Sequence, residues 1–201
     1  MSDMANNSNA KIYKIVDKML TCMFVLCTAS ALSQNQPLSQ NQTKTQKMTK
    51  TDFTTTFLVD QTPKEAFNAI NNPREWWSEE IEGSTDKLND VFIYQYEDVH
   101  YCQMQIVEEI PDKRVVWLVK YNYFNFTHDK SEWTGTKIIF DISAKDKKTQ
   151  VRFTHLGLVP TYECFDICSN AWSQYIQQSL FSLITTGKGK PNKFNKRVKA
   201  L

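Results

Sequence analysis

The segment from residue 162 to 186 constrains the fold of this chain more than any other. Apolar residues recur in it every three or four positions, the spacing that aligns them on one face of an α-helix. These residues are Phe165, Cys168, Trp172, Ile176, Leu180 and Leu183. The opposite face carries Glu163, Asp166, Asn170, Ser173, Gln174, Gln177 and Gln178. With Pro160 before it and Gly187 after it as end signals, the segment predicts one long amphipathic helix that lies on an apolar surface.

The residues before this helix predict that surface, because most of them have strand character. Alternating or continuous apolar patterns indicate strands over residues 53–59, 91–97, 101–110, 114–121, 133–143 and 149–155. Thr62-Pro63-Lys64-Glu65 has the form of a capping box with proline at the first helical position, which predicts a short helix. A second helical turn is expected over residues 74–78, and a polar loop over residues 82–90. The order indicates an α+β fold in which two short helices follow the first strand and an antiparallel sheet carries the long C-terminal helix.

Charge is distributed unevenly along the 201 residues, whose net charge is +2. Residues 51–187 carry a net charge of −8, whereas residues 188–201 carry +6. An acidic body argues against a nucleic-acid surface on the folded domain, since phosphate binding needs clustered Lys and Arg. The basic segment 188–201 is interpreted as a solvated tail.

The first fifty residues form two segments outside the predicted domain. Residues 1–33 contain an apolar run of signal-peptide length, followed by the small-residue pattern Ala29-Ser30-Ala31. Cleavage near Ala31 or Ser33 and export is one interpretation, and a retained segment in a cytoplasmic protein is the other. Residues 34–50 are rich in Gln, Asn and Thr, with no apolar face to bury, and are expected to be a disordered linker. No integral membrane segment is expected in the mature domain.

The cysteines favour a reducing compartment. Beyond the N-terminal segment, Cys102, Cys164 and Cys168 make an odd number with no disulfide-framework spacing. Reduced thiols fit this pattern better than disulfides, which favours the cytoplasm.

Four motifs resemble the START-like, helix-grip (SRPBCC) superfamily. They are Trp76-Trp77-Ser78-Glu79-Glu80-Ile81-Glu82-Gly83, Glu132-Trp133-Thr134-Gly135-Thr136, Phe153-Thr154-His155-Leu156-Gly157-Leu158-Val159-Pro160, and the final helix with Cys164, Cys168, Trp172 and Gly187-Lys188-Gly189. Within that superfamily the chain resembles the bacterial branch named after activators of the heat shock protein 90 ATPase. The resemblance covers residues from about 52 to 190. It implies a curved antiparallel sheet that grips the C-terminal helix, with a cavity between them that in many relatives holds an apolar small molecule.

Aromatic and sulfur side chains are the residues that the wall of such a cavity needs, together with a few polar groups. The candidates for ligand contact are Trp76, Trp77, Tyr94, Tyr96, Trp117, Trp133, Phe140, His155, Cys168 and Trp172. The alternative for most of them is simple core packing. His155 ends a strand, where it either orients a ligand at the cavity mouth or secures the strand end by a hydrogen bond.

The sequence gives little support to catalysis or metal binding. The His and Cys residues lack the spacing of a structural zinc site, and no phosphate loop, nucleophile elbow or dinucleotide fingerprint is present. No metal, cofactor or catalytic residue is therefore assigned. Cys168 lies on the apolar stripe, where a cysteine is usually a small buried hydrophobe. The acids Glu79, Glu80 and Glu82 are expected to be solvated.

Three functions remain open at this stage. The preferred one is non-catalytic binding of an apolar or amphipathic small molecule between sheet and helix. The second is a co-chaperone-like protein-interaction domain that uses an exposed face, with a chaperone or another protein as partner. The third is a cyclase-like or dehydratase-like enzyme, which shapes a cavity around a reactive substrate and leaves little sequence signature.

Overall fold

The computed structural model describes residues 51–193. The predicted signal peptide or retained segment, the linker and residues 194–201 of the predicted tail lie outside the described residues. No helix within residues 51–193 is both long and apolar enough to cross a bilayer.

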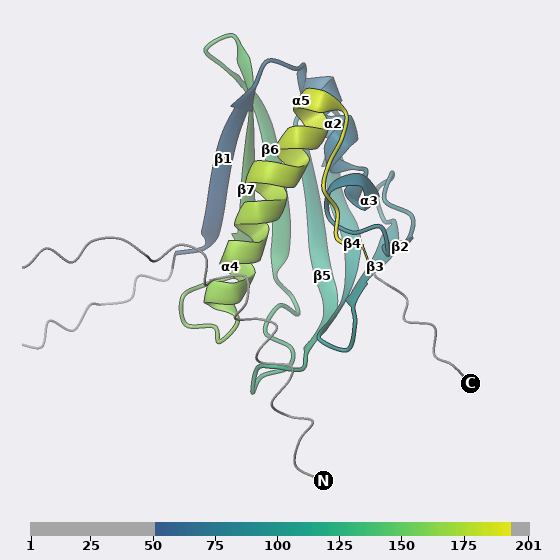
Figure 1. The fold of residues 1–201 in the computed structure, drawn as a ribbon, viewed down its shortest axis with the longest axis vertical. Coiled ribbons are helices and arrows are strands. Elements are labelled where there is room, and N and C mark those ends of the chain that lie inside the picture. Colours follow the sequence, from purple (N-terminus) through teal and green to yellow (C-terminus); the bar gives the residue numbers. More distant parts are fainter. Residues whose placement is uncertain (1–50, 194–201) are drawn as a thin grey trace, which may run out of the picture. The chain divides into compact units, whose positions relative to one another are not determined.

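Seven antiparallel strands form one sheet in the order β1-β7-β6-β5-β4-β3-β2 (Figure 1). The strands are β1 (Phe53–Val59), β2 (Glu82–Gly83), β3 (Val91–Tyr96), β4 (His100–Ile110), β5 (Arg114–Phe124), β6 (Lys137–Lys145) and β7 (Lys148–Leu156). Tight turns join β3 to β4, β4 to β5 and β6 to β7, so the middle of the chain runs as successive hairpins. The first strand pairs with the last and forms one edge of the sheet, with Phe53 opposite His155 and Val59 opposite Thr149.

The helices lie on one face of this sheet (Figure 1). α2 (Pro63–Ile70) begins with the predicted capping box, in which Thr62 Oγ1 accepts from Glu65 N and the Glu65 carboxylate accepts from Thr62 N. α3 (Pro73–Trp76) follows as a single turn. The long C-terminal helix consists of α4 (Phe165–Gln174), a π-helical segment η1 (Tyr175–Leu180) and α5 (Phe181–Thr186), and Gly187 ends it in the left-handed conformation. The predicted α+β architecture is confirmed.

The π-helical segment follows from the spacing of the buried residues. Trp172, Ile176 and Leu180 are four residues apart and all buried. On an α-helix each four-residue step turns through about 400°, so such a series drifts around the axis by about 40° per step. A π turn contains more residues than an α turn, so it compensates for this rotation and keeps the row of buried residues against the sheet.

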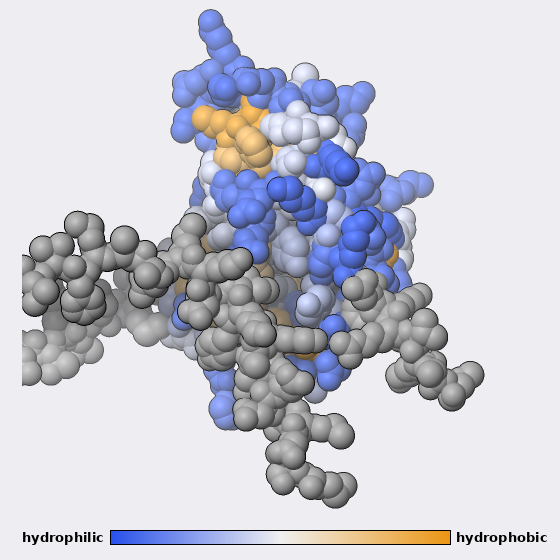
Figure 2. Space-filling model, in the orientation of Figure 1, coloured by the Kyte–Doolittle hydropathy of each residue, from blue (hydrophilic) through white to orange (hydrophobic). Residues whose placement is uncertain are grey.

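The opposite face of the helix is polar, as predicted. Ile167 of α4 is an exception, since it is 56% exposed. Figure 2 shows this side of the molecule, where hydrophilic side chains surround an orange patch near the upper end of the helix. Two partly exposed apolar residues, Leu58 of β1 and Phe181 of α5, belong to the elements in that region. Gln177 lies farther down on this side and donates to Thr56 O and Thr55 Oγ1, which ties the helix to the edge strand.

Several element boundaries differ from the prediction, and β5, for example, ends at Phe124 rather than Tyr121. The final helix begins at Phe165 rather than near residue 162, because the Glu132 carboxylate accepts from Glu163 N and Cys164 N and so caps the helix from a distant loop. The sixth strand begins at Lys137 rather than Trp133, since Thr136 N donates to Trp133 O in a turn. Residues 82–83 form the short edge strand β2 within the segment predicted as a polar loop.

The chain after the helix also departs from the expected solvated tail. Lys190 N donates to Ser179 Oγ, and Asn192 forms backbone hydrogen bonds with Trp77 and Glu79. Gly189 passes so close to α3 that an added Cβ would lie 2.1 Å from Glu75 O. Residues 188–193, here called the C-terminal strap, are therefore part of the folded domain.

Candidate functional site

An aromatic cluster fills the space between the sheet and the C-terminal helix. We call it the aromatic wall, and it consists of Trp76, Trp77, Tyr94, Trp117, Trp133, Phe140 and Trp172. Stacked or tilted pairs dominate it: ring centroids lie 6.2 Å apart between Trp76 and Trp117, 5.1 Å between Trp77 and Trp172, and 5.9 Å between Trp133 and Trp172. All seven side chains are buried. The rings therefore serve as packing for one another in this structure.

One polar atom within the wall has no partner. Trp117 is fully buried, and its Nε1 has no hydrogen-bond acceptor among the described residues. Buried polar groups are nearly always bonded, because desolvation without a partner is costly. By contrast, Trp133 Nε1 donates to Cys164 Sγ and Trp172 Nε1 donates to His155 Nδ1.

His155 has both ring nitrogens engaged. Thr136 Oγ1 donates its proton to Trp133 O at 2.6 Å, so it accepts from His155 Nε2 at 2.8 Å. This assigns the Nε2–H tautomer and leaves Nδ1 to accept from Trp172 Nε1 at 3.1 Å. Burial lowers the pKa of His155 to about 3, so the ring stays neutral at physiological pH. A neutral histidine bonded on both sides fits the strand-securing role that the sequence left open.

A second histidine, partly buried, was not predicted as part of the site. His100, at the start of β4, lies 4.9 Å from the Trp133 ring and 5.2 Å from the Tyr94 ring. Its Nε2 pairs with Asn122 Oδ1 at 3.0 Å, and burial lowers its pKa to about 3. Its position could have been inferred from β4, where Cys102, Met104 and Ile106 continue the same inward-facing alternation.

Three buried cysteines near the wall form no disulfide. Cys102, Cys164 and Cys168 are free and buried. Burial raises the pKa of Cys102, and a hydrogen bond with Cys164 followed by burial raises that of Cys168. Since the thiolate is the nucleophile, this arrangement does not activate Cys168. Within residues 51–193, no group of three or more His, Cys, Asp and Glu side chains is placed to hold a metal ion.

The polar end of the wall lies at Tyr94 and the C-terminal strap. Tyr94 stacks on Trp77 with 4.4 Å between centroids, and its hydroxyl accepts from Asn192 Nδ2 at 3.2 Å. Burial raises the pKa values of Tyr94 and of Tyr175 in η1, so both hydroxyls remain protonated. Asn192 Oδ1 is shielded from solvent and has no partner among the described residues. Asn192 gave no signal in the sequence, because nothing local connects it to the wall.

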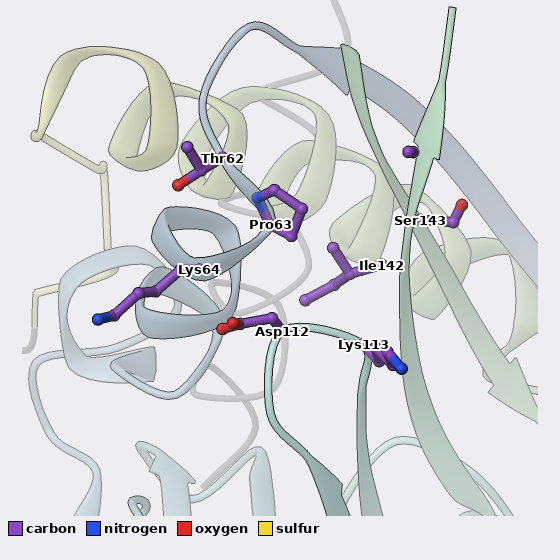
Figure 3. A pocket seen from close by; sticks show the side chains of 8 residues that line it. Thr62, Pro63, Lys64, Asp112, Lys113, Ile142 and Ser143 are labelled. Carbon is purple, nitrogen blue, oxygen red and sulfur yellow. The ribbon is translucent and has the colours of Figure 1, made fainter. Parts of the chain in front are cut away.

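Two hollows open elsewhere on the described surface. One, which we call the tyrosine hollow, is lined by Tyr101, Gln103, Tyr121 and Tyr123. These side chains alternate with inward-facing ones on β4 and β5, so the hollow lies on the sheet face away from the helix. The other lies between the start of α2, the β4–β5 turn and β6 (Figure 3). Its lining includes Thr62, Pro63 and Ile142.

The structure brings nine of the ten predicted ligand-contact residues into one buried cluster. Tyr96 is the exception, because β3 ends there at the sheet edge and leaves its side chain 40% exposed. Tyr175, Asn192 and His100 join the cluster without having been predicted.

The fold matches several solved structures. The Aha1 dimer from Colwellia psychrerythraea matches with a TM-score of 0.56 and 22% identity, over 69% of this chain and 99% of that chain. The domain has the Aha1 fold. The Mll3558 protein from Rhizobium loti matches with a TM-score of 0.52 and 13% identity, over 68% of this chain and 98% of that one. DynU16, a protein of the dynemicin biosynthetic locus, matches with a TM-score of 0.50 and 12% identity, over 69% of this chain and 48% of that one.

No family model and no curated protein sequence matches the chain. The Aha1-like, helix-grip fold expected from the four motifs is nevertheless present. At these identities the likeness concerns the fold.

Proposed function

We propose that the domain binds an apolar or amphipathic small molecule between its sheet and its C-terminal helix, without catalysing a reaction. The observation that carries the proposal is the buried Trp117 Nε1, an unpartnered donor inside an otherwise apolar wall. A ligand acceptor would satisfy this group, and the surrounding rings would supply burial. The π-helical segment η1 adds support, since π turns occur often at functional sites and Tyr175 begins this one.

The proposal includes a rearrangement on binding, because the rings of the wall pack against one another. Trp77 is the residue best placed to move. It lies at the end of the wall, between Tyr94 and Trp172, and the short helix α3 that precedes it is a single turn. Rotation of this indole would open space beside Trp117, whose ring centroid is 6.2 Å away.

Native mass spectrometry tests the proposal on the intact protein purified from its own source. We expect a fraction of the protein to carry an additional small-molecule mass that is lost on denaturation. Trp77→Ala in the same host should change the retained fraction, whereas Tyr121→Ala in the tyrosine hollow should not. Protein that retains nothing, and that binds no neutral aromatic dye after purification, would argue against a small-molecule site.

A second function is favoured by the tyrosine hollow. Tyr121 and Tyr123 are 50% and 39% exposed on a face that no described helix covers. Exposed aromatic clusters are common at protein interfaces. A co-chaperone-like interaction through this face is the alternative that the Aha1 fold suggests.

The interaction hypothesis is tested by the steady-state ATPase rate of the host's heat shock protein 90. Stimulation by the wild type that is lost with Tyr121→Ser plus Tyr123→Ser would support it. Unchanged ATPase rates with the wild type would contradict it, whatever the result for small molecules.

A further inference from the structure

The aromatic wall offers no charged partner to a ligand. His100 and His155 face it in neutral form, because burial holds both pKa values near 3. The hydroxyls of Tyr94 and Tyr175 stay protonated for the same reason. A hydrogen bond with Cys164, together with burial, raises the pKa of the neighbouring Cys168 thiol, which stays protonated.

The buried carboxylate of the described domain is already occupied. Glu132 is the one Asp or Glu among the buried residues of 51–193. Its two oxygens accept from Glu163 N at 2.6 Å and Cys164 N at 3.0 Å, at the start of the C-terminal helix. A charged ligand group in the wall would lose its hydration without gaining an ion pair, which is strongly unfavourable.

Where the wall meets the C-terminal strap, the two side chains in contact, Tyr94 and Asn192, are polar and uncharged, and the nearby Lys193 pairs with Glu79 at the surface. Asn192 is fixed there by its own backbone, since its N donates to Trp77 O at 3.0 Å and its O accepts from Glu79 N at 3.2 Å. Its side-chain Nδ2 donates to Tyr94 Oη, so the amide oxygen is left as a free acceptor shielded from solvent. A hydroxyl or N–H of a ligand is the group that would complete it.

We propose that the ligand is an uncharged, flat apolar molecule that carries one hydrogen-bond donor, and that Asn192 of the C-terminal strap binds this donor. The inference rests on the proposed small-molecule function. It also assigns the strap to the site: residues 188–193 complete the polar end of a wall that β3, β5 and the helix build from the other side.

The charge requirement is tested with two dyes that share one ring system. N-phenylnaphthylamine is neutral, and anilinonaphthalene sulfonate carries a negative charge. We expect the full-length protein to enhance the fluorescence of the neutral dye and to bind the sulfonate roughly a hundredfold more weakly or worse, because the charge would be buried without a partner. Trp77→Ala should alter binding of the neutral dye, and Tyr121→Ala should not.

The role of Asn192 is tested by competition. Naphthol should displace the neutral dye at roughly fivefold lower concentration than naphthalene, because only naphthol can donate to the amide oxygen. Asn192→Leu should remove this preference, while Asn170→Leu on the solvent face of the helix should keep it. Asn192→Ser serves as a second variant, and thermal melting of both shows whether the domain remains folded.

The possible results distinguish the inference of an uncharged ligand bound by Asn192 from the proposed small-molecule function. Failure of the neutral dye to bind would overturn the small-molecule function itself. Equal affinity for both dyes, with both sensitive to Trp77→Ala, would leave the function standing and overturn the uncharged-ligand inference. A naphthol preference that persists in both folded Asn192 variants would overturn the assignment of Asn192.

Discussion

His155 and Trp172 join the last strand to the C-terminal helix through a buried hydrogen bond. The bond fixes the histidine tautomer, and the Thr136 hydroxyl holds the other ring nitrogen. Trp172 is only 2% exposed, and its ring lies 4.9 Å from that of Phe153. The indole nitrogen of Trp172 therefore contributes to the contact between strand and helix, in addition to the size and shape of the ring.

The histidine makes stability depend on pH. The folded pKa of His155 lies near 3, below its usual 6.5, so the unfolded state binds more protons between these values. Stability from this group is complete above pH 6.5 and declines as the pH falls toward 3. We expect His155→Gln to reduce the slope of unfolding free energy against pH by up to about 1.4 kcal/mol per pH unit below pH 6. Urea denaturation between pH 7 and 4.5 measures the slope of the unfolding free energy against pH. Identical slopes for the wild type and His155→Gln would show that His155 is protonated in the folded protein.

Trp172 variants separate packing from hydrogen bonding. Trp172→Ala should destabilise the domain by about 3 to 5 kcal/mol, because it opens a void beside Trp77 and Trp133. Trp172→Phe keeps most of the ring but leaves His155 Nδ1 without a donor, for an expected cost of about 1 to 3 kcal/mol. Equilibrium urea unfolding measures both, with the exposed Gln178→Ala as control. A Trp172→Phe variant as stable as wild type would mean that the hydrogen bond contributes nothing.

At the scale of elements, the C-terminal strap connects the helix to α3. Ser179 of the π-helical segment is central to it, since its hydroxyl donates to Trp76 O and accepts from Lys190 N. An ion pair between Lys193 and Glu79 continues the contact at the surface, where such pairs contribute little. The strap therefore depends on backbone fit and on the buried serine.

Substitution of Gly189 tests how closely the strap backbone packs against α3. The Gly189 backbone leaves no room for a side chain, because a Cβ would meet Glu75 O at 2.1 Å and Glu75 C at 3.0 Å. We expect Gly189→Ala to destabilise the domain by about 1 to 3 kcal/mol as the strap shifts away from α3. Lys188→Ala, at an exposed neighbouring position, should change stability by less than about 0.5 kcal/mol. Thermal melting compares the two, and equal melting temperatures would place the strap outside the cooperative unit.

At the scale of the whole molecule, residues 51–193 contain a complete sheet, a helical layer and a continuous core. All seven strands of the sheet lie within this range, and β1 pairs with β7 along its whole length.

Removing residues 1–50 should therefore leave a cooperative thermal transition unchanged within about 2 °C, since stability resides in the described domain. Circular dichroism on the full chain and on the truncated chain measures it. A truncation that melts gradually would show that the first fifty residues contribute to the fold.

In cells, N-terminal sequencing of the protein decides its processing: a start near Leu32 or Gln34 means cleavage and export, and an intact start means retention.

Local patterns were sufficient for most elements. The alternation in 53–59 and the capping box at Thr62 depend on neighbours within a few residues, and both elements form where the sequence predicts them. The boundaries at Trp133 and Tyr162 were missed for the opposite reason. Gly135 N donates to Val119 O beside the Trp133 turn, and the Glu132 carboxylate accepts from Cys164 N, so both boundaries involve partners that the local pattern does not contain.

The sequence by itself determined which residues face the core, because periodicity places side chains on one side of a strand or helix before any tertiary contact exists. Only the tertiary structure decided what those residues do together. The hydrogen bonds of His155 with Thr136 and Trp172, and that of Asn192 with Tyr94, join segments distant in the chain. Hydrogen bonds of this kind depend on the distance and angle between folded elements, which no local pattern encodes.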